Sequence, residues 1–144
     1  MAGNAVLREV SLALPMVADM EIAATKTVTS LAEFMKMSPD KIDEVRLAVV
    51  EACINAFEHS HARDGMVHLT FAVLGDREPE KLQITVRDSG RGFNPAALEE
   101  PSIANKLKSD RKRGWGLKII EGLMDEVTIT SGGGGTSVVM SKVR

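Results

Sequence analysis

The sequence predicts an α+β fold, a two-layer α/β sandwich in which helices cover one face of a mixed, mostly antiparallel sheet. Two long stretches, residues 15–37 and 41–61, repeat apolar residues every three to four positions, which is typical of amphipathic helices. Shorter stretches that alternate in polarity or are rich in β-branched residues predict strands at 6–14, 66–74, 81–88, 126–131 and 136–142.

The predicted helices have recognisable beginnings. Pro15 is expected to open the first helix, because proline suits a first turn, and its apolar face includes Ile22, Val28 and Phe34. Ser38 or Asp40 is positioned to cap the second helix. A shorter third helix is predicted over residues 116–124.

The predicted strands differ in their surroundings. Residues 6–14 alternate only approximately, as expected for a strand at the sheet edge, whereas 81–88 alternate clearly. Residues 89–113 predict a loop, with one helical turn near 95–98. Loops of this length in a small domain are usually functional or mobile.

Size and composition narrow the function classes. The chain has 144 residues, 44% of them hydrophobic and 26% charged, which indicates one globular domain over residues 1–144. A formal net charge of −2 argues against a nucleic-acid-binding protein. With no apolar run of membrane-spanning length and no signal peptide, the expected location is cytoplasmic and away from membranes. Cys53 lies in an apolar helical segment and predicts a buried, inert thiol.

Two polar residues of the second helix are candidates for chemistry. Glu51 and Asn55 are four residues apart, so they share one helix face, and Glu51 is flanked by apolar residues on both sides. A carboxylate in such a segment must pair, shift its pKa upward or border a cavity. Their oxygens suit a Mg²⁺-phosphate site. The alternative is an ordinary exposed polar pair.

A second candidate follows the predicted strand 81–88. Asp88, Gly90 and Gly92 are spaced so that the glycines permit close backbone approach to a ligand. The Asp88 carboxylate can accept a hydrogen bond from an amino group such as that of adenine. A plain turn is the alternative.

Two further candidates involve glycines. Gly114, Gly116 and Leu117 precede or open the third helix, where free backbone N–H groups can meet phosphate oxygens; a flexible hinge is the alternative. Arg113 beside them suits a terminal phosphate, while Lys106 and Lys108 are expected to lie on the solvated surface. Four glycines before Thr136 predict a loose hairpin turn, from which the Thr136 hydroxyl could reach a ligand.

In order and spacing these segments resemble the asparagine box and the three glycine boxes of the GHKL ATPases. The resemblance covers roughly residues 40 to 142. Three segments are most similar to the anti-sigma-factor serine kinases of that superfamily, namely 51–59 (EACINAFEH), 113–117 (RGWGL) and 124–127 (MDEV). The resemblance implies the Bergerat ATP-binding fold and ATP or ADP with Mg²⁺ as cofactors.

The resemblance also implies residue roles. Asn55 would hold Mg²⁺ on the ATP phosphates, Glu51 would accept the proton of the attacking serine, and Arg113 would contact the γ-phosphate. Asp88 would receive the adenine amine. The pocket would be shaped by Gly90 and Gly92, its phosphate end closed by Gly114, Gly116 and Leu117, and the nucleotide covered by a lid over residues 97–113.

Kinases of this type phosphorylate a serine of a small anti-sigma-factor antagonist and, in alternation, bind and inhibit a sigma factor, usually as homodimers. The resemblance implies these partners here. Two alternatives remain: a non-catalytic nucleotide-gated protein-binding switch, and a detached histidine-kinase ATPase domain. The last is disfavoured because no helical hairpin with a phospho-acceptor histidine precedes the domain.

Overall fold

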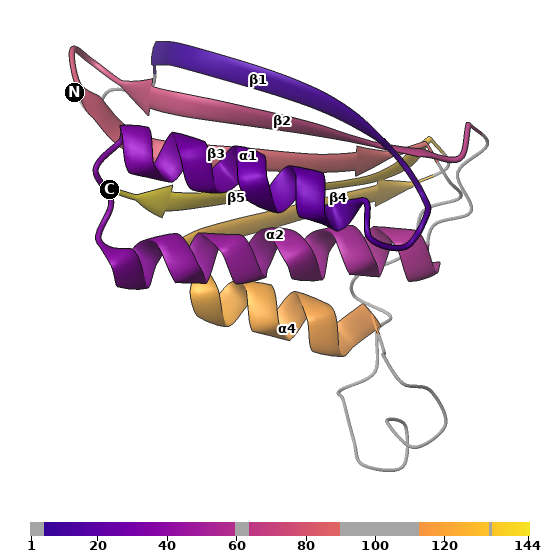
Figure 1. Ribbon diagram of the computed structural model, residues 1–144. Helices are drawn as coiled ribbons and strands as arrows, with labels where there is room; N and C mark the ends of the chain where they lie inside the picture. The colour runs from indigo at the N-terminus through magenta and orange to yellow at the C-terminus, as the bar shows by residue number, and fades with distance from the viewer. Residues whose placement is uncertain (1–4, 60–63, 90–112, 133) are drawn as a thin grey trace.

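The computed structural model describes residues 5–59, 64–89, 113–132 and 134–144 (Figure 1). Its elements, in chain order, are β1 (Ala5–Pro15), α1 (Glu21–Phe34), α2 (Pro39–His59), β2 (Met66–Gly75), β3 (Pro79–Asp88), α4 (Arg113–Leu123), β4 (Glu126–Gly132) and β5 (Gly135–Val143). The predicted α+β class and the number and order of the predicted strands are confirmed.

The five strands form one sheet in the order β1-β2-β3-β5-β4, and every neighbouring pair is antiparallel. β1 lies at one edge, as its imperfect alternation predicted, and its register shifts between Val6 and Arg8. β2 with β3, and β4 with β5, are hairpins, so most of the sheet is built from strands that follow one another in the chain.

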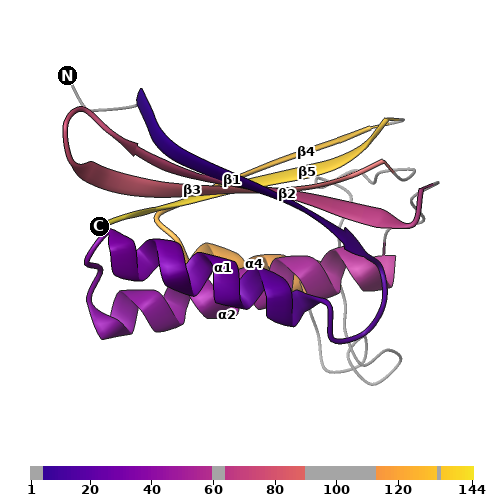
Figure 2. The same cartoon turned by 45° about the horizontal axis from the view of Figure 1, so that its top comes forward.

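The three described helices lie on the same face of the sheet (Figure 2), with α2 between α1 and α4 (Figure 1). The apolar stripe predicted for α2 is buried in the core, which confirms that prediction; its fully or nearly fully buried members are Val45, Ala48, Val49, Ala52 and Ala56. Among the described residues, no helix combines the length and the apolar character needed to cross a bilayer.

The prediction for the first helix was wrong at its start and in part of its face. Pro15 ends β1, and α1 begins only at Glu21, after Asp19 adopts a left-handed φ of 78°. A proline fits the end of an edge strand as well as a first helical turn, so its presence did not decide between them. Ile22 and Phe34 are both 51% exposed, because the helix turns Ala24, Val28 and Ala32 to the core instead.

The third helix also begins earlier than predicted. α4 starts at Arg113, so Gly114 and Gly116 lie in its first turn and not in a loop before it. The first N–H groups of a helix have no partner within it, so they remain available to an anion. The predicted loop with its helical turn near 95–98 lies mostly outside the described residues.

Candidate functional site

Glu51 and Asn55 lie on one side of α2, next to the apolar stripe that packs on the sheet. Both are buried, with only 7% and 8% of their surfaces exposed. The alternative left open by the sequence, an ordinary exposed polar pair, is therefore wrong. Because an isolated carboxylate is costly to bury, the buried Glu51 indicates a candidate functional site in this part of α2.

The first turn of α4 packs against this pair. A Cβ atom built on Gly116 would lie 3.6 Å from Asn55 Oδ1 and 3.8 Å from Glu51 Oε2. Leu117, the next residue, is 4% exposed and joins the hydrophobic core, so this turn of α4 packs on the core. The glycine therefore leaves the two side-chain oxygens within reach of the N-terminal turn of α4.

A second group of predicted residues meets where β3 and β5 pair. Asp88 and Thr136 are cross-strand partners, and each is 8% exposed. The Thr136 hydroxyl lies 3.0 Å from Ser131 Oγ on β4. Since these positions alternate with outward-facing ones, Asp88, Thr136 and Ser131 form a polar row on the helix-covered face of the sheet.

The glycine turn beside this row is tighter than the loose turn the sequence suggested. Gly135 has a φ of 124°, and a Cβ built on it would lie 2.0 Å from the carbonyl oxygen of Asp88. Only glycine fits there. A hollow of about 250 Å³ at this end of the sheet is lined by Arg87 and Asp88 of β3 and by residues of the β4–β5 hairpin, among them Gly135 and Thr136. That volume is below the range typical of sites that enclose a drug-sized molecule, so the hollow by itself is too small to enclose one.

The two groups lie at the same end of the molecule. In both views, the C-terminal end of β3, the turn between β4 and β5, the C-terminal end of α2 and the N-terminal end of α4 point to one side (Figures 1 and 2). The segments that carry the predicted site residues, far apart in the sequence, are thus gathered by the fold.

Some predicted site residues lie outside this description. Gly90, Gly92 and residues 97–112 of the lid predicted over 97–113 fall outside the described residues. Arg113 and Gly114 belong to the first turn of α4, but the side chain of Arg113 is not described. The roles assigned to these residues stay predictions.

Comparison with known proteins identifies the family. Residues 16–142 match the family described as "Histidine kinase-like ATPase domain", which is most of the chain. The chain belongs to this ATPase family. The match spans both groups of buried polar residues, Glu51 with Asn55 and Asp88 with Thr136.

Within the histidine kinase-like ATPase family, the relatives of this chain include an anti-sigma factor and serine-protein kinases. The chain is 36% identical over 124 residues to the anti-sigma F factor of Clostridium acetobutylicum, covering 85% of this chain and 84% of that one. It is 35% identical over 122 residues to the serine-protein kinase RsbW of Bacillus licheniformis, covering 81% and 73%.

A solved structure supports the fold. The RsbU and RsbW domains of a Mycobacterium tuberculosis protein superpose with a TM-score of 0.68 at 20% identity. The match covers 94% of this chain but only 32% of that longer one. At this identity the likeness concerns the arrangement of helices and strands.

The sequence reasoning missed one polar cluster of this ATPase domain. Asp64 Oδ1 accepts hydrogen bonds from Met66 N at 3.0 Å and from Ser89 Oγ at 3.4 Å, and Asp64 Oδ2 lies 3.1 Å from His68 Nε2. The hydrogen bond with His68, followed by that from Met66 N–H, lowers the pKa of Asp64. Because Ser89 follows Asp88 directly, Asp64 helps fix where the chain leaves β3. The Asp-Gly pair at 64–65 was the available signal, since it is typical of turns.

Cys53, between Glu51 and Asn55 on α2, is fully buried, as predicted. Burial, and secondarily the negative charge of Glu21, raises the pKa of its thiol to about 12. The thiolate is therefore scarce at neutral pH, and Cys53 acts as a small core residue.

Proposed function

We propose that this chain is an ATP- and Mg²⁺-dependent protein-serine kinase, a single ATP-binding domain over residues 1–144. It would phosphorylate an anti-sigma-factor antagonist and bind and inhibit a sigma factor. The support is the family membership together with relatives named anti-sigma F factor and serine-protein kinase over most of their lengths. The observation that carries the proposal is the contact of the Gly116 turn with buried Glu51 and Asn55.

The proposed roles follow from the positions of these groups. Glu51 accepts the proton of the partner's serine hydroxyl, the serine oxygen forms a bond to the γ-phosphorus, and the bond to the bridging oxygen breaks so that ADP leaves. The first N–H groups of α4 face the phosphates, and Arg113 contacts the γ-phosphate.

At the other end of the nucleotide, Asp88 accepts a hydrogen bond from the adenine amino group, and the Thr136 hydroxyl lies beside it in the same polar row. Gly90 and Gly92 shape this pocket, while Gly114 and Leu117 close the phosphate end. Buried acceptors and donors of this kind select a base by hydrogen bonding, because a mismatched ligand leaves them without a partner.

The donor set fits Mg²⁺ held mainly by the nucleotide. Magnesium in kinase sites commonly takes one or two protein oxygens and otherwise phosphates and water. The described residues hold no cluster of three or more acidic, histidine or cysteine side chains that would form an all-protein cage. Asn55 Oδ1 is the proposed protein ligand, and the ion would neutralise charge on the phosphates. We further propose a homodimer in the cytoplasm.

Phosphate transfer tests this function. The purified protein is incubated with γ-labelled ATP, Mg²⁺ and the proteins encoded by neighbouring genes, and the labelled protein and side chain are identified by mass spectrometry. Labelled serine on the antagonist is the expected result. ATP binding without any transfer would instead indicate a nucleotide-gated binding switch, and acid-labile phosphohistidine would indicate a histidine kinase; either outcome overturns the proposal.

Replacing Gly116 should separate stability from nucleotide binding. The new methyl group of Gly116→Ala is in ordinary contact with Asn55 and Glu51, so it should not destabilise the fold, and alanine favours the helix by up to about 1 kcal/mol. The methyl group would, however, occupy the space between these oxygens and a bound phosphate. We expect an ATP affinity lower by about tenfold or more, measured by titration calorimetry.

Gly122→Ala is the matched control for this experiment. Gly122 is exposed in the same helix, and a Cβ there meets no atom within 4 Å. This variant should gain helix stability and keep wild-type affinity. Equal affinities of the two variants would show that the Gly116 turn does not face the nucleotide.

A further inference from the structure

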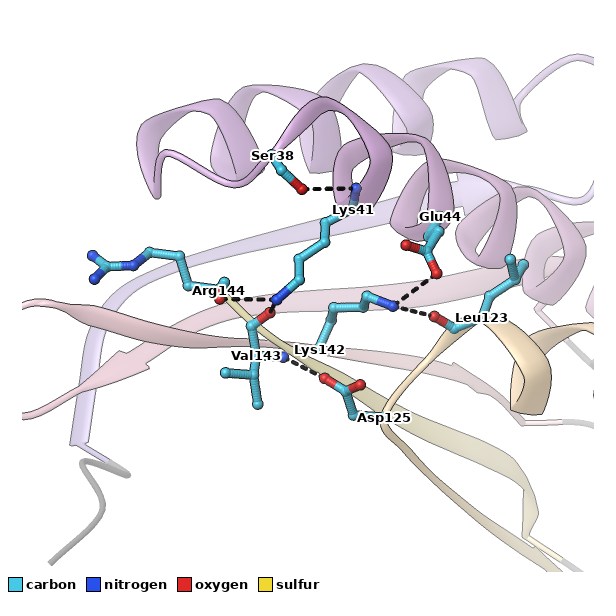
Figure 3. Close-up of polar contacts among 8 residues, drawn as sticks. All are labelled: Ser38, Lys41, Glu44, Leu123, Asp125, Lys142, Val143 and Arg144. Carbon is cyan, nitrogen blue, oxygen red and sulfur yellow. Dashed lines mark hydrogen bonds and ion pairs between the residues drawn. The ribbon is translucent and has the colours of Figure 1, made fainter.

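A lysine is buried at the opposite end of the core, at the C-terminal end of β5. Lys142 is 6% exposed and follows the alternation that turns Val138 and Met140 toward the helices. Its ammonium group donates to Glu44 Oε2 of α2 at 3.0 Å and to the carbonyl oxygen of Leu123 at 2.6 Å (Figure 3). One side chain therefore joins the sheet to two helices.

The contact with Leu123 is a cap on α4. Leu123 is the last residue of this helix, and the last carbonyl groups of a helix have no partner within it. These carbonyls also carry the negative end of the helix dipole, which favours a cation. Taking an ammonium group out of water is costly, and here its bonds to Glu44 and Leu123 offset that cost. An apolar residue would not have this desolvation cost, so packing alone does not explain a lysine at this position.

The reason lies at the other end of α4. The helix has 11 residues, so it is roughly 16 Å long, and it transmits a displacement of one end to the other. Its last residue is held by Lys142, while its first turn places Gly116 against Asn55 and Glu51. Between the two ends of α4, Ile120 and Leu117 are buried, but their apolar contacts are not directional.

We propose that Lys142 is a positioning residue for the nucleotide site, acting through α4. The polar contacts of its ammonium group fix where α4 ends along the sheet, and the rigid helix then sets how closely its first turn approaches Asn55. This inference rests on the proposed nucleotide-binding function. It concerns a residue that contacts no reacting group.

The same end of the molecule offers a matched control. Lys41 Nζ donates to the carbonyl oxygens of Val143 at 3.1 Å and Arg144 at 3.0 Å, so it also ties a helix to the end of β5 (Figure 3). Among its described hydrogen bonds none goes to α4. Lys41→Met and Lys142→Met thus remove the same charge from the same neighbourhood, and only the second removes a hydrogen bond to α4.

The experiment measures α4 and the site separately. In the nucleotide-free variants, amide hydrogen exchange is followed over residues 113–123, and ATP affinity is then measured by calorimetry. For Lys142→Met we expect exchange at least tenfold faster than wild type across α4, and ATP affinity lower by about tenfold or more, because a small misplacement of a binding group is costly. Lys41→Met should match wild type in both, and Lys142→Arg, which keeps a cationic donor, should recover part of the affinity.

Unchanged exchange and affinity in Lys142→Met overturn the inference, and so do equal changes in both Met variants. Should Lys142→Met not fold, Lys142→Gln is measured instead, because its shorter, neutral side chain removes the cation from the Leu123 carbonyl group while staying polar. Faster α4 exchange and weaker ATP binding are expected there too, and wild-type values would overturn the inference. If the wild-type protein binds no ATP, the proposed function fails, while the exchange data still decide whether Lys142 holds α4.

Discussion

Glu51→Gln should slow phosphate transfer to the partner serine by roughly 10²–10⁴-fold, the usual contribution of a general base. Glutamine keeps the size of the side chain but accepts no proton. The substitution therefore removes the proton acceptor and preserves the packing of this buried side chain. Transfer is measured with labelled ATP at saturating partner, and ATP binding by calorimetry, which should stay within about twofold of wild type because Asn55 is intact.

Glu58→Gln on the same helix provides the comparison, because Glu58 is exposed and lies outside the proposed site. It should transfer phosphate at the wild-type rate. If Glu51→Gln also transferred at that rate while binding ATP, the base would have to be another residue.

Gly135→Ala should be the most destabilising of the glycine substitutions in the turn between β4 and β5. The new Cβ would lie 2.0 Å from the Asp88 carbonyl oxygen, and φ of 124° is a conformation that side chains rarely adopt. Backbone strain of this kind costs about 3 kcal/mol. The melting temperature should fall by roughly 10 °C, measured by calorimetric or circular-dichroism unfolding.

Gly134→Ala tests whether the position or the residue type matters. A Cβ on Gly134 meets no atom within 4 Å, so this variant should melt within about 2 °C of wild type, as surface substitutions usually do. A similarly small shift for Gly135→Ala would mean that the turn moves away from Asp88 at little cost. Strong destabilisation of Gly135→Ala would show that the fold requires the close approach of this turn to Asp88, on the adenine side of the proposed site.

The polarity pattern of the sequence predicted which helices and strands form better than it predicted where they begin and end. The strands, their order and the buried stripe of α2 follow from periodicity, because burial on one face imposes a period on the sequence. Pro15 misled the assignment because both a strand end and a helix start accept it. The exposed Ile22 and Phe34 of α1 show the same limit, since apolar side chains also occur on surfaces.

For the site, the sequence identified the residue types but not their contacts. Four consecutive glycines give no indication that Gly135 is the one that needs a special φ, because that depends on a strand 47 positions earlier in the chain. Lys142 was overlooked although the alternation of its strand placed it on the core face, since lysine is rarely buried. Both contacts arise from tertiary packing.

The chain excursion between β1 and β2 has a consequence for the order of folding. The two hairpins, β2 with β3 and β4 with β5, close short loops, whereas β1 pairs with β2 only after α1, α2 and all connecting residues from Pro15 to Met66 are placed. Long-range pairing is slower because more chain entropy is lost before contacts form. We expect β1 to join the sheet after the β2–β3 hairpin has formed, so that in pulse-labelling its amides gain protection later than those of β3.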